Sequence, residues 1–400
     1  MHELKRLHVL FANEFGRGNG HAIALKQVVG HLRFSHPNAR CRVYLPSPDA
    51  GLRAGLEASL VFAPDFLQRG SSAPNYKGAH TYGSMFLRSL LHDGEALRRR
   101  LAGWDAVLRE FQPDVIVADY ANCLAMVAWG RVPVLVIGSG YTLPPPEASH
   151  FMSIVQGWQS DLREEAQQLE ALNSFLRQAG AAPLDFLPQI NRANAHALLS
   201  LPIFDPYNDI RKQHYLGVSL PGGAPRPKPG SASGCFAYFS ELPSAESGQM
   251  IATDLQACGL PVEAYIEGKT TADFGASEAT RMTLLHKLQV LAETLPGKAV
   301  IVHRGTLGIA VAALYAGVPQ IALYLNDENW VVSNGLLKEG IGLSVQLSSL
   351  VPEELATMMR AVVNDQAMRA RALRFADIYA HFAASDPAQR VADLAVGLLR

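Results

Sequence analysis

The stretch AVIVHRGTLGIAVAALYAGVPQIALYLNDENWVVSN, residues 299–334, decides the fold that we expect for this chain. It opens with a short run rich in Val and Ile, residues 299–302, which is typical of a buried parallel strand. A glycine-containing turn and an Ala-rich segment suited to a helix follow. Gly317-Val318-Pro319 ends that helix because proline lacks a backbone N–H, and residues 320–325 form a second β-type run. The stretch therefore predicts a βαβ unit, which presents a helix N-terminus able to hold a phosphate at the carboxyl edge of its sheet.

Length and composition indicate a globular protein with two domains. The chain has 400 residues, more than one core usually organises, and 48% of them are hydrophobic, which argues against disorder. A formal net charge of −1 at pH 7 gives no reason to expect nucleic acid or an anionic membrane as a partner. The four cysteines are widely spaced and form no CxxC or Cys/His pattern, so we expect reduced thiols and no metal site.

The sequence predicts neither a secretion signal nor a transmembrane segment. Residues 1–16 have a basic start, but their apolar part is short and no small-residue cleavage site follows. Residues 305–326 carry no charge and are long enough to span a bilayer, yet the Gly-Val-Pro break divides them into halves of different type. A folded βαβ unit fits this stretch better, and we expect a cytoplasmic protein.

A second strand, glycine loop and helix lie near the start of the chain. Residues 7–11 are a compact apolar run, a GxGxG loop ends at Gly20, and residues 22–33 have helical spacing. That loop alone is a weak signal, because a tight strand-to-helix turn needs glycines with or without a ligand. His21 follows directly and would face the open edge of the sheet. Further along, PDVIVADY places Asp119 at the carboxyl end of another predicted strand, where it either acts on a ligand or caps the next helix.

The remaining segments complete two halves rich in βα units. We expect further strands at residues 41–45, 132–137, 197–201, 214–218, 235–239 and 262–266, and a surface loop at 63–82. We expect helices at 85–111, 121–129, within 151–180, and at 247–257, 283–295, 350–364, 366–384 and 387–399. Because PGGAPRPKPG is the clearest linker, the predicted domains are residues 1–218 and 233–385, joined by the linker 219–232, with 386–400 as a returning helix.

This organisation and its motifs resemble the UDP-glycosyltransferase superfamily of inverting glycosyltransferases, which includes bacterial macrolide and antibiotic glycosyltransferases. The resemblance covers most of the chain and is carried by GRGNGHAIAL, PDVIVADY, LPIFDPYNDIRKQHYLG and VIVHRGTLGIAVAALYAGVPQIALYLNDEN. It implies an α/β fold of the GT-B class, in which two Rossmann-like domains face each other across a cleft and the C-terminal helix crosses back to the first domain. The first domain would bind the acceptor and the second the nucleotide sugar.

The implied activity is the metal-independent, inverting transfer of a sugar from a UDP- or TDP-sugar to a hydroxyl of a small-molecule or lipid acceptor. By resemblance, His21 is the general base, and Asp119 orients it and stabilises the imidazolium. No cofactor is implied, because the nucleoside-diphosphate sugar is a co-substrate, and a homodimer is left open. Two alternatives stay open as well: a GT-B nucleotide-sugar epimerase and a catalytically inactive nucleotide-sugar-binding protein.

The implied donor site contains the glycine turn of residues 303–308, and there the sequence departs from the family. The family turn usually reads His-Gly-Gly-x-Gly-Thr, and counting back from Pro319 puts its histidine at Arg304, one residue after His303. Either His303 still reaches the diphosphate, or Arg304 does so as a permanently charged, bidentate phosphate ligand. The expected donor-binding residues are Gly18, Gly20, Ser240, His303, Arg304, Gly305, Thr306, Gly308, Asp327, Glu328 and Asn329.

Overall fold

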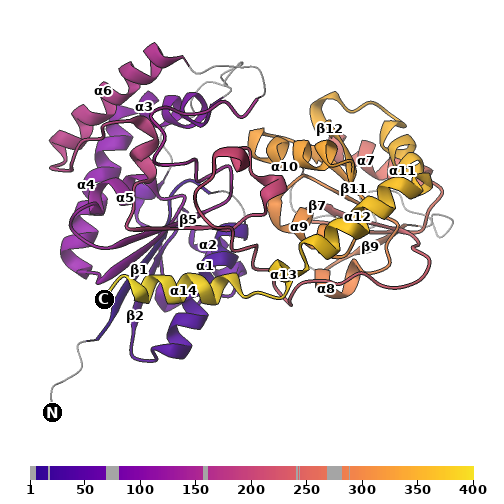
Figure 1. The fold of residues 1–400 in the computed structure, drawn as a ribbon, viewed down its shortest axis with the longest axis horizontal. Coiled ribbons are helices and arrows are strands. Elements are labelled where there is room, and N and C mark those ends of the chain that lie inside the picture. Colours follow the sequence, from indigo (N-terminus) through magenta and orange to yellow (C-terminus); the bar gives the residue numbers. More distant parts are fainter. Residues whose placement is uncertain are drawn as a thin grey trace. The chain divides into compact units, whose positions relative to one another are not determined.

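The computed structural model describes residues 6–16, 19–68, 81–155, 161–239, 242, 244–267, 282–287 and 289–400. The chain divides into two compact units, each with its own sheet and core (Figure 1). Unit 1 comprises Met1–Ser200, Pro206–Leu216 and Asp386–Arg400, and unit 2 comprises Leu201–Asp205 and Gly217–Ser385. The chain therefore passes from one unit to the other more than once.

Unit 1 is built on a six-stranded parallel sheet with the order β3-β2-β1-β4-β5-β6. Its strands are β1 (His8–Asn13), β2 (Arg40–Tyr44), β3 (Val61–Phe62), β4 (Val115–Asp119), β5 (Val134–Gly138) and β6 (Ala195–Leu198). β1 and β4 pair in register, with Asn13 opposite Asp119, so the two strands end side by side. The strand order reverses at this pair, which is where open α/β sheets place their ligands.

Helices cover both faces of this sheet, which is why its strands are apolar on both sides. Val9 and Phe11 of β1 pack with the helices α1 (Asn19–Ser35) and α14 (Pro387–Gly397), whereas Leu10 packs with α4 (Gly94–Phe111) and α5 (Asn122–Ala128). The C-terminal helix α14 thus belongs to unit 1, as expected, and lies beside α1 in Figure 1. The helices of unit 1 are α1 (Asn19–Ser35), α2 (Pro48–Arg53), α3 (Arg88–His92), α4 (Gly94–Phe111), α5 (Asn122–Ala128), α6 (Leu162–Gln178) and α14 (Pro387–Gly397).

Two predicted elements of unit 1 are wrong in part. The single helix expected at 85–111 is interrupted, because α4 starts anew after Asp93, whose carboxylate accepts the Ala96 N–H at 2.9 Å and caps it. Residues 214–218, expected to form a strand, contribute one bridge between Tyr215 and Leu198. Most of the loop predicted at 63–82 lies outside the described residues.

Unit 2 repeats the same topology with the strand order β12-β11-β10-β7-β8-β9. Its strands are β7 (Cys235–Phe239), β8 (Val262–Ile266), β9 (Met282–Leu285), β10 (Val300–His303), β11 (Gln320–Tyr324) and β12 (Gly342–Gln346). Its helices are α7 (Ala245–Ala257), α8 (Leu291–Thr294), α9 (Leu307–Tyr315), α10 (Asp327–Lys338), α11 (Glu354–Asn364), α12 (Gln366–Ile378) and α13 (Ala380–Ala383). The order reverses between β7 and β10, so the βαβ unit at 299–325 begins at the central position of this sheet.

One predicted helix of unit 2 is wrong in its first half. Residues 283–285, expected to be helical, belong to the edge strand β9, in which Thr283 pairs with Glu263 of β8, and among the described residues of the predicted range only Leu291–Thr294 is helical. Backbone pairing along β8 outweighs the local helical pattern there. The sequence patterns also missed α10 and β12, which follow β11.

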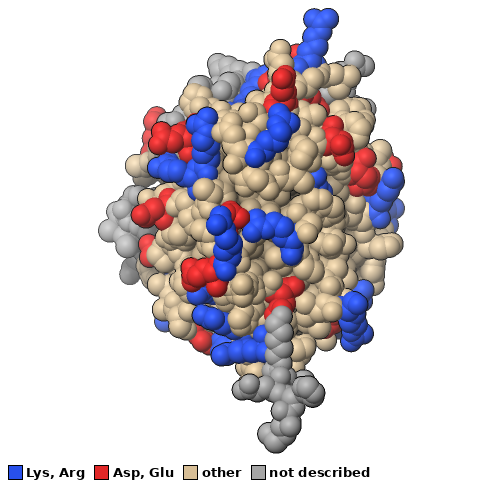
Figure 2. Space-filling model, turned by 90° about the vertical axis from the view of Figure 1, so that its left-hand side faces the viewer, with Lys and Arg blue, Asp and Glu red and all other residues tan. Residues whose placement is uncertain are grey.

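Neither a membrane-spanning helix among the described residues nor a field of one charge on the face of Figure 2 is present. Within the described residues, every helix is too short or too polar to cross a bilayer. On the face shown in Figure 2, basic and acidic side chains are interspersed. This distribution agrees with the near-zero net charge of the sequence.

Candidate functional site

His21 and Asp119 form the centre of the candidate site in unit 1. His21 lies in the first turn of α1, and Asp119 is the last residue of β4. The two side chains meet because β1 and β4 are neighbours, and His21 Nδ1 lies 2.8 Å from Asp119 Oδ2. The Asp119 side chain is 5% exposed and that of His21 is 19% exposed. A buried carboxylate thus holds an imidazole that still reaches the surface.

This pair determines which imidazole nitrogen can take up a proton. An ionised carboxylate only accepts hydrogen bonds, so Nδ1 of His21 donates to Asp119 and Nε2 carries the lone pair. Asp119 would also stabilise the imidazolium that forms when Nε2 is protonated. The N-cap position of α5 is Ala121 and not Asp119, so helix capping does not explain the aspartate. The pair has the arrangement of a general base and its orienting carboxylate.

The glycine loop before α1 makes room for the His21 ring. A Cβ added at Gly16 would fall 2.5 Å from His21 Nε2 and 2.5 Å from Asn13 Nδ2, so a side chain there would displace the ring. At Gly20, by contrast, nothing lies within 4 Å of such an atom. Gly18 lies outside the described residues. The sequence pattern indicated the loop as a whole, but Gly16 is the described glycine that the site requires.

Two residues beside Gly16, which sequence reasoning missed, join the loops that carry the pair. Asn13 donates from Nδ2 to the Asp119 carbonyl oxygen at 3.1 Å. Glu14 accepts the Leu124 N–H at 2.7 Å. Both contacts link residues more than a hundred positions apart, and the only sequence signal for them is that polar residues follow an apolar strand.

Aromatic rings pack beside the pair. The Tyr120 ring lies 6.2 Å from that of His21, 5.7 Å from Phe15 and 5.6 Å from Phe86, measured between centroids. Phe86 in turn stacks on the fully buried Tyr82. These rings come from the loops after β1 and β4 and from the segment that leads into α3. They give His21 an apolar, aromatic neighbour on one side.

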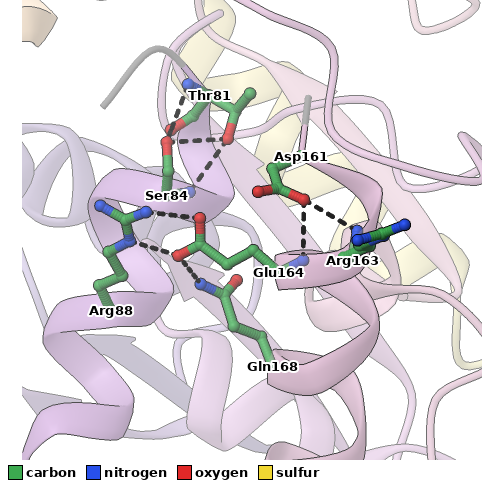
Figure 3. A network of polar contacts seen from close by, with 7 residues as sticks. All are labelled: Thr81, Ser84, Arg88, Asp161, Arg163, Glu164 and Gln168. Atoms are coloured by element: carbon green, nitrogen blue, oxygen red, sulfur yellow. Dashed lines mark hydrogen bonds and ion pairs between the residues drawn. The ribbon is translucent and has the colours of Figure 1, made fainter. Parts of the chain in front are cut away.

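A polar network fixes the segment that carries Tyr82 and Phe86. Figure 3 shows Arg88 of α3 forming a two-pronged ion pair with Glu164 of α6, and Gln168 donating to the same carboxylate at 2.9 Å. Bidentate guanidinium–carboxylate pairs of this kind also fix geometry. Asp161 caps α6 by accepting the Glu164 N–H at 3.1 Å. The segment that carries Tyr82 and Phe86 is therefore held against α6 by this network.

His303, the second histidine of interest, lies in the interior of unit 2. Its side chain is 0% exposed. Nδ1 accepts the Gly305 N–H at 2.9 Å, and Nε2 lies 3.0 Å from Oε1 of Gln320, which in turn donates to the Ala310 carbonyl at 3.1 Å. Burial lowers the pKa of His303 to about 4, although the bond to Gln320 opposes this, so the ring is neutral at pH 7. Both ring nitrogens bond inside unit 2, an arrangement that suits a role of His303 in shaping the turn, and its contact with a diphosphate stays a prediction from the sequence.

The turn after His303 leads into the start of α9. Gly305 has φ +78°, and a Cβ there would lie 2.8 Å from Ser333 Oγ and 2.9 Å from the Asn329 carbonyl oxygen. Only glycine fits this backbone against α10. Thr306 is the N-cap residue of α9, but its side chain makes no capping hydrogen bond. The first N–H groups of a helix have no partner within the helix, so this turn suits an anion.

Three further predicted donor residues begin α10, beside this turn. Asp327 is exposed, Glu328 is half-buried and Asn329 is 4% exposed. Asn326 caps α10 by accepting the Asn329 N–H at 2.9 Å. The structure thus brings residues 304–308 and the first turn of α10 together, whereas Ser240 lies outside the described residues. Among the described residues, no group of three or more His, Cys, Asp or Glu side chains is arranged to hold a metal ion.

Comparisons with known proteins agree with this architecture. Residues 284–396 match the family model described as erythromycin biosynthesis protein CIII-like, C-terminal domain. No curated protein matches the sequence at a significant level. The chain superposes on the glycosyltransferase of kitacinnamycin with a TM-score of 0.67 and 18% identity, over 99% of this chain and 100% of the other. For the glycosyltransferase VinC in complex with dTDP, the TM-score is 0.68 and the identity 16%, over 98% and 99%.

The chain has the GT-B fold. A further GT-B neighbour, the glycosyltransferase SnogD from Streptomyces nogalater, gives a TM-score of 0.61 at 20% identity, over 99% of this chain and 100% of the other. The expected fold class and the resemblance to macrolide and antibiotic glycosyltransferases are thereby confirmed. In GT-B terms, His21 and Asp119 belong to the first Rossmann-like domain, and the turn after His303 belongs to the second.

Proposed function

We propose that the protein is an inverting glycosyltransferase that moves a sugar from a nucleoside-diphosphate sugar to a hydroxyl of a small-molecule or lipid acceptor. The observation that carries this proposal is the His21–Asp119 pair, which lies where the strand order of the unit 1 sheet reverses. The fold supports it, since neighbours with the same fold are glycosyltransferases, and VinC was solved in complex with dTDP. UDP- and dTDP-sugars are therefore the donors to test first.

The pair would supply the base of the reaction. The acceptor hydroxyl gives its proton to Nε2 of His21 while its oxygen attacks the anomeric carbon. The bond between that carbon and the diphosphate oxygen breaks, and the diphosphate leaves with its added negative charge. Asp119 stabilises the imidazolium, and attack opposite the leaving group inverts the anomeric centre.

Unit 2 would supply the anion site. Arg304 and the first N–H groups of α9 would hold the diphosphate, with Gly305, Thr306 and Gly308 as the turn around it. No metal ion or cofactor is needed in this scheme, because these groups neutralise the leaving charge. Asp327, Glu328 and Asn329 would bind sugar hydroxyls. Contacts of Gly18, Gly20 and Ser240 with the donor stay predictions from sequence.

The proposal is tested by incubating the protein with UDP- and dTDP-sugars and a panel of hydroxylated acceptors. We expect a glycoside in the mass spectrum, with the opposite anomeric configuration to the donor by NMR. A changed donor sugar without acceptor would support an epimerase instead. Binding of UDP or dTDP without any turnover would support a binding protein, and binding of neither nucleotide would contradict the proposal.

A further inference from the structure

Glu14 is a buried carboxylate to which the proposed chemistry gives no role. It directly follows β1 and is 3% exposed. Its Oε1 accepts the N–H of Leu124, the third residue of α5, at 2.7 Å. The N-cap residue of α5, Ala121, provides no side-chain cap of its own. Glu14 therefore caps, from the β1 loop, the helix that follows Asp119.

The same residue also bonds the turn between Asp119 and α5. The backbone N–H of Glu14 donates to the Tyr120 carbonyl at 3.3 Å. Tyr120 has φ +50°, a left-handed conformation that residues other than glycine rarely adopt without support from their surroundings. Glu14 therefore forms hydrogen bonds with both Tyr120 and Leu124. These bonds bridge the turn that connects Asp119 to α5.

Arg100 of α4 provides the positive charge behind this loop. Burial raises the pKa of Glu14 above its ordinary value, although the charge of Arg100 and the bond from Leu124 oppose this. Arg100 is itself 7% exposed, and its guanidinium carbon lies 4.7 Å from the centroid of the Phe15 ring. One arginine thus interacts with two consecutive loop residues, with Glu14 through charge and with Phe15 through its ring face.

We propose that Glu14 is the positioning residue of the His21–Asp119 pair. By capping α5 from the β1 loop, it holds the two loops in the arrangement in which His21 Nδ1 meets the Asp119 carboxylate. Glu14 does not touch the reacting atoms and acts only through this geometry. Its effect on turnover rests on the proposed function, but the position of the His21 ring can be measured without turnover.

Two substitutions separate the hydrogen bond of Glu14 from its charge. Glu14→Gln keeps the length of the side chain and an oxygen that can accept the Leu124 N–H, but loses the charge. Glu14→Asp keeps the charge but is one methylene shorter, so it cannot make this bond. The matched control is Asp254→Ala, because Asp254 is another buried capping carboxylate, 1% exposed, which accepts the Glu353 and Leu355 N–H groups at 2.9 and 3.0 Å in unit 2.

The main readout is the ¹⁵N imidazole NMR signal of His21, assigned through its absence in His21→Gln. We expect Glu14→Gln to keep the wild-type signal, with Nδ1 protonated, and Glu14→Asp to shift or broaden it. In the same variant, kcat falls by about tenfold or more, because small displacements of a catalytic group are costly, while the Kd for UDP or dTDP changes less than about twofold. Asp254→Ala lowers the Tm and leaves the His21 signal and kcat unchanged.

An unchanged His21 signal in Glu14→Asp overturns the proposal. A changed signal in Glu14→Gln does so too, and this variant keeps the test decisive if Glu14→Asp does not fold. Failure of the proposed function is a separate result: the wild-type protein would then transfer no sugar, or His21→Ala would leave transfer intact. In that case the His21 signal still decides whether Glu14 positions the ring.

Discussion

Each unit has a histidine close to the carboxyl end of a central strand, His21 in the first turn of α1 and His303 as the last residue of β10, and the two have opposite surroundings. The sheets share one strand order, with β1 and β4 at the reversal in unit 1 and β7 and β10 in unit 2. His21 is partly exposed and bonds a carboxylate, whereas His303 is fully buried and bonds an amide and a backbone N–H. One arrangement suits proton transfer and the other suits a fixed turn. The partner and the exposure, more than the place in the fold, determine the chemistry of each histidine.

The difference also extends to the glycines beside each histidine. Gly16 leaves space for the His21 ring, and Gly305 leaves space for α10 to pack on the turn after His303. In unit 1, Gly16 thus makes room for the His21 side chain. In unit 2, Gly305 makes room for α10 beside the turn that leads into α9. Substitutions beside His21 in unit 1 should therefore change catalysis. Substitutions at the turn after His303 in unit 2 should change stability or donor binding.

The largest effect on stability is expected from the protonation of His303. The unfolded chain binds a proton to this imidazole near pH 6.5, but the folded chain does so only near pH 4. Stability from neutral His303 is therefore present above pH 6.5 and is lost as the pH falls toward 4, by about 3 kcal/mol. In His303→Asn this loss should be absent. The free energy of unfolding of unit 2 can be measured at each pH by proteolysis of the whole protein over a range of urea concentrations, followed through peptides from unit 2. An equal loss in both proteins over this range would show that His303 is not held neutral.

A smaller effect, on turnover, is expected from Gly16→Ala. The added methyl would collide with the His21 ring, so kcat should fall roughly 10- to 100-fold, as for other small displacements of a catalytic group. The control is Gly30→Ala in α1, the helix that carries His21, where nothing lies within 4 Å of the added atom. This control should keep wild-type turnover and gain up to about 1 kcal/mol of stability. Equal turnover in both variants would show that Gly16 does not hold the ring in place.

The smallest effect is expected in donor binding at the turn of unit 2. Arg304→Ala should weaken the binding of UDP or dTDP about tenfold, the loss typical of one charge-assisted hydrogen bond. His303→Asn should change this affinity less than about threefold, because an asparagine oxygen can still accept the Gly305 N–H. Calorimetry below the Tm of both variants measures the two values. The reverse order would make His303 the phosphate ligand and remove the contrast between the two histidines.

The sequence predicted those parts of the fold and site that local patterns encode. The strand, helix and strand at 299–325 were predicted to within about two residues, because glycine, proline and apolar runs mark their ends locally. The proximity of His21 and Asp119 came from the resemblance to a family. The cap from Glu14 to Leu124 joins residues 110 positions apart, and the bond from His303 to Gln320 depends on two adjacent strands. Such contacts exist only after the sheet has formed, so no local pattern indicates them.

The central claim is that the His21–Asp119 pair performs the chemistry while the turn in unit 2 binds the donor. It is tested most directly by measuring the single-turnover rate of transfer and the Kd of the donor nucleotide on His21→Ala. We predict that the rate falls by about 10²-fold or more, as expected for loss of a general base, and that the Kd stays within about threefold of the wild-type value. A rate within threefold of wild type, or a loss of nucleotide binding equal to the loss of rate, would contradict the account.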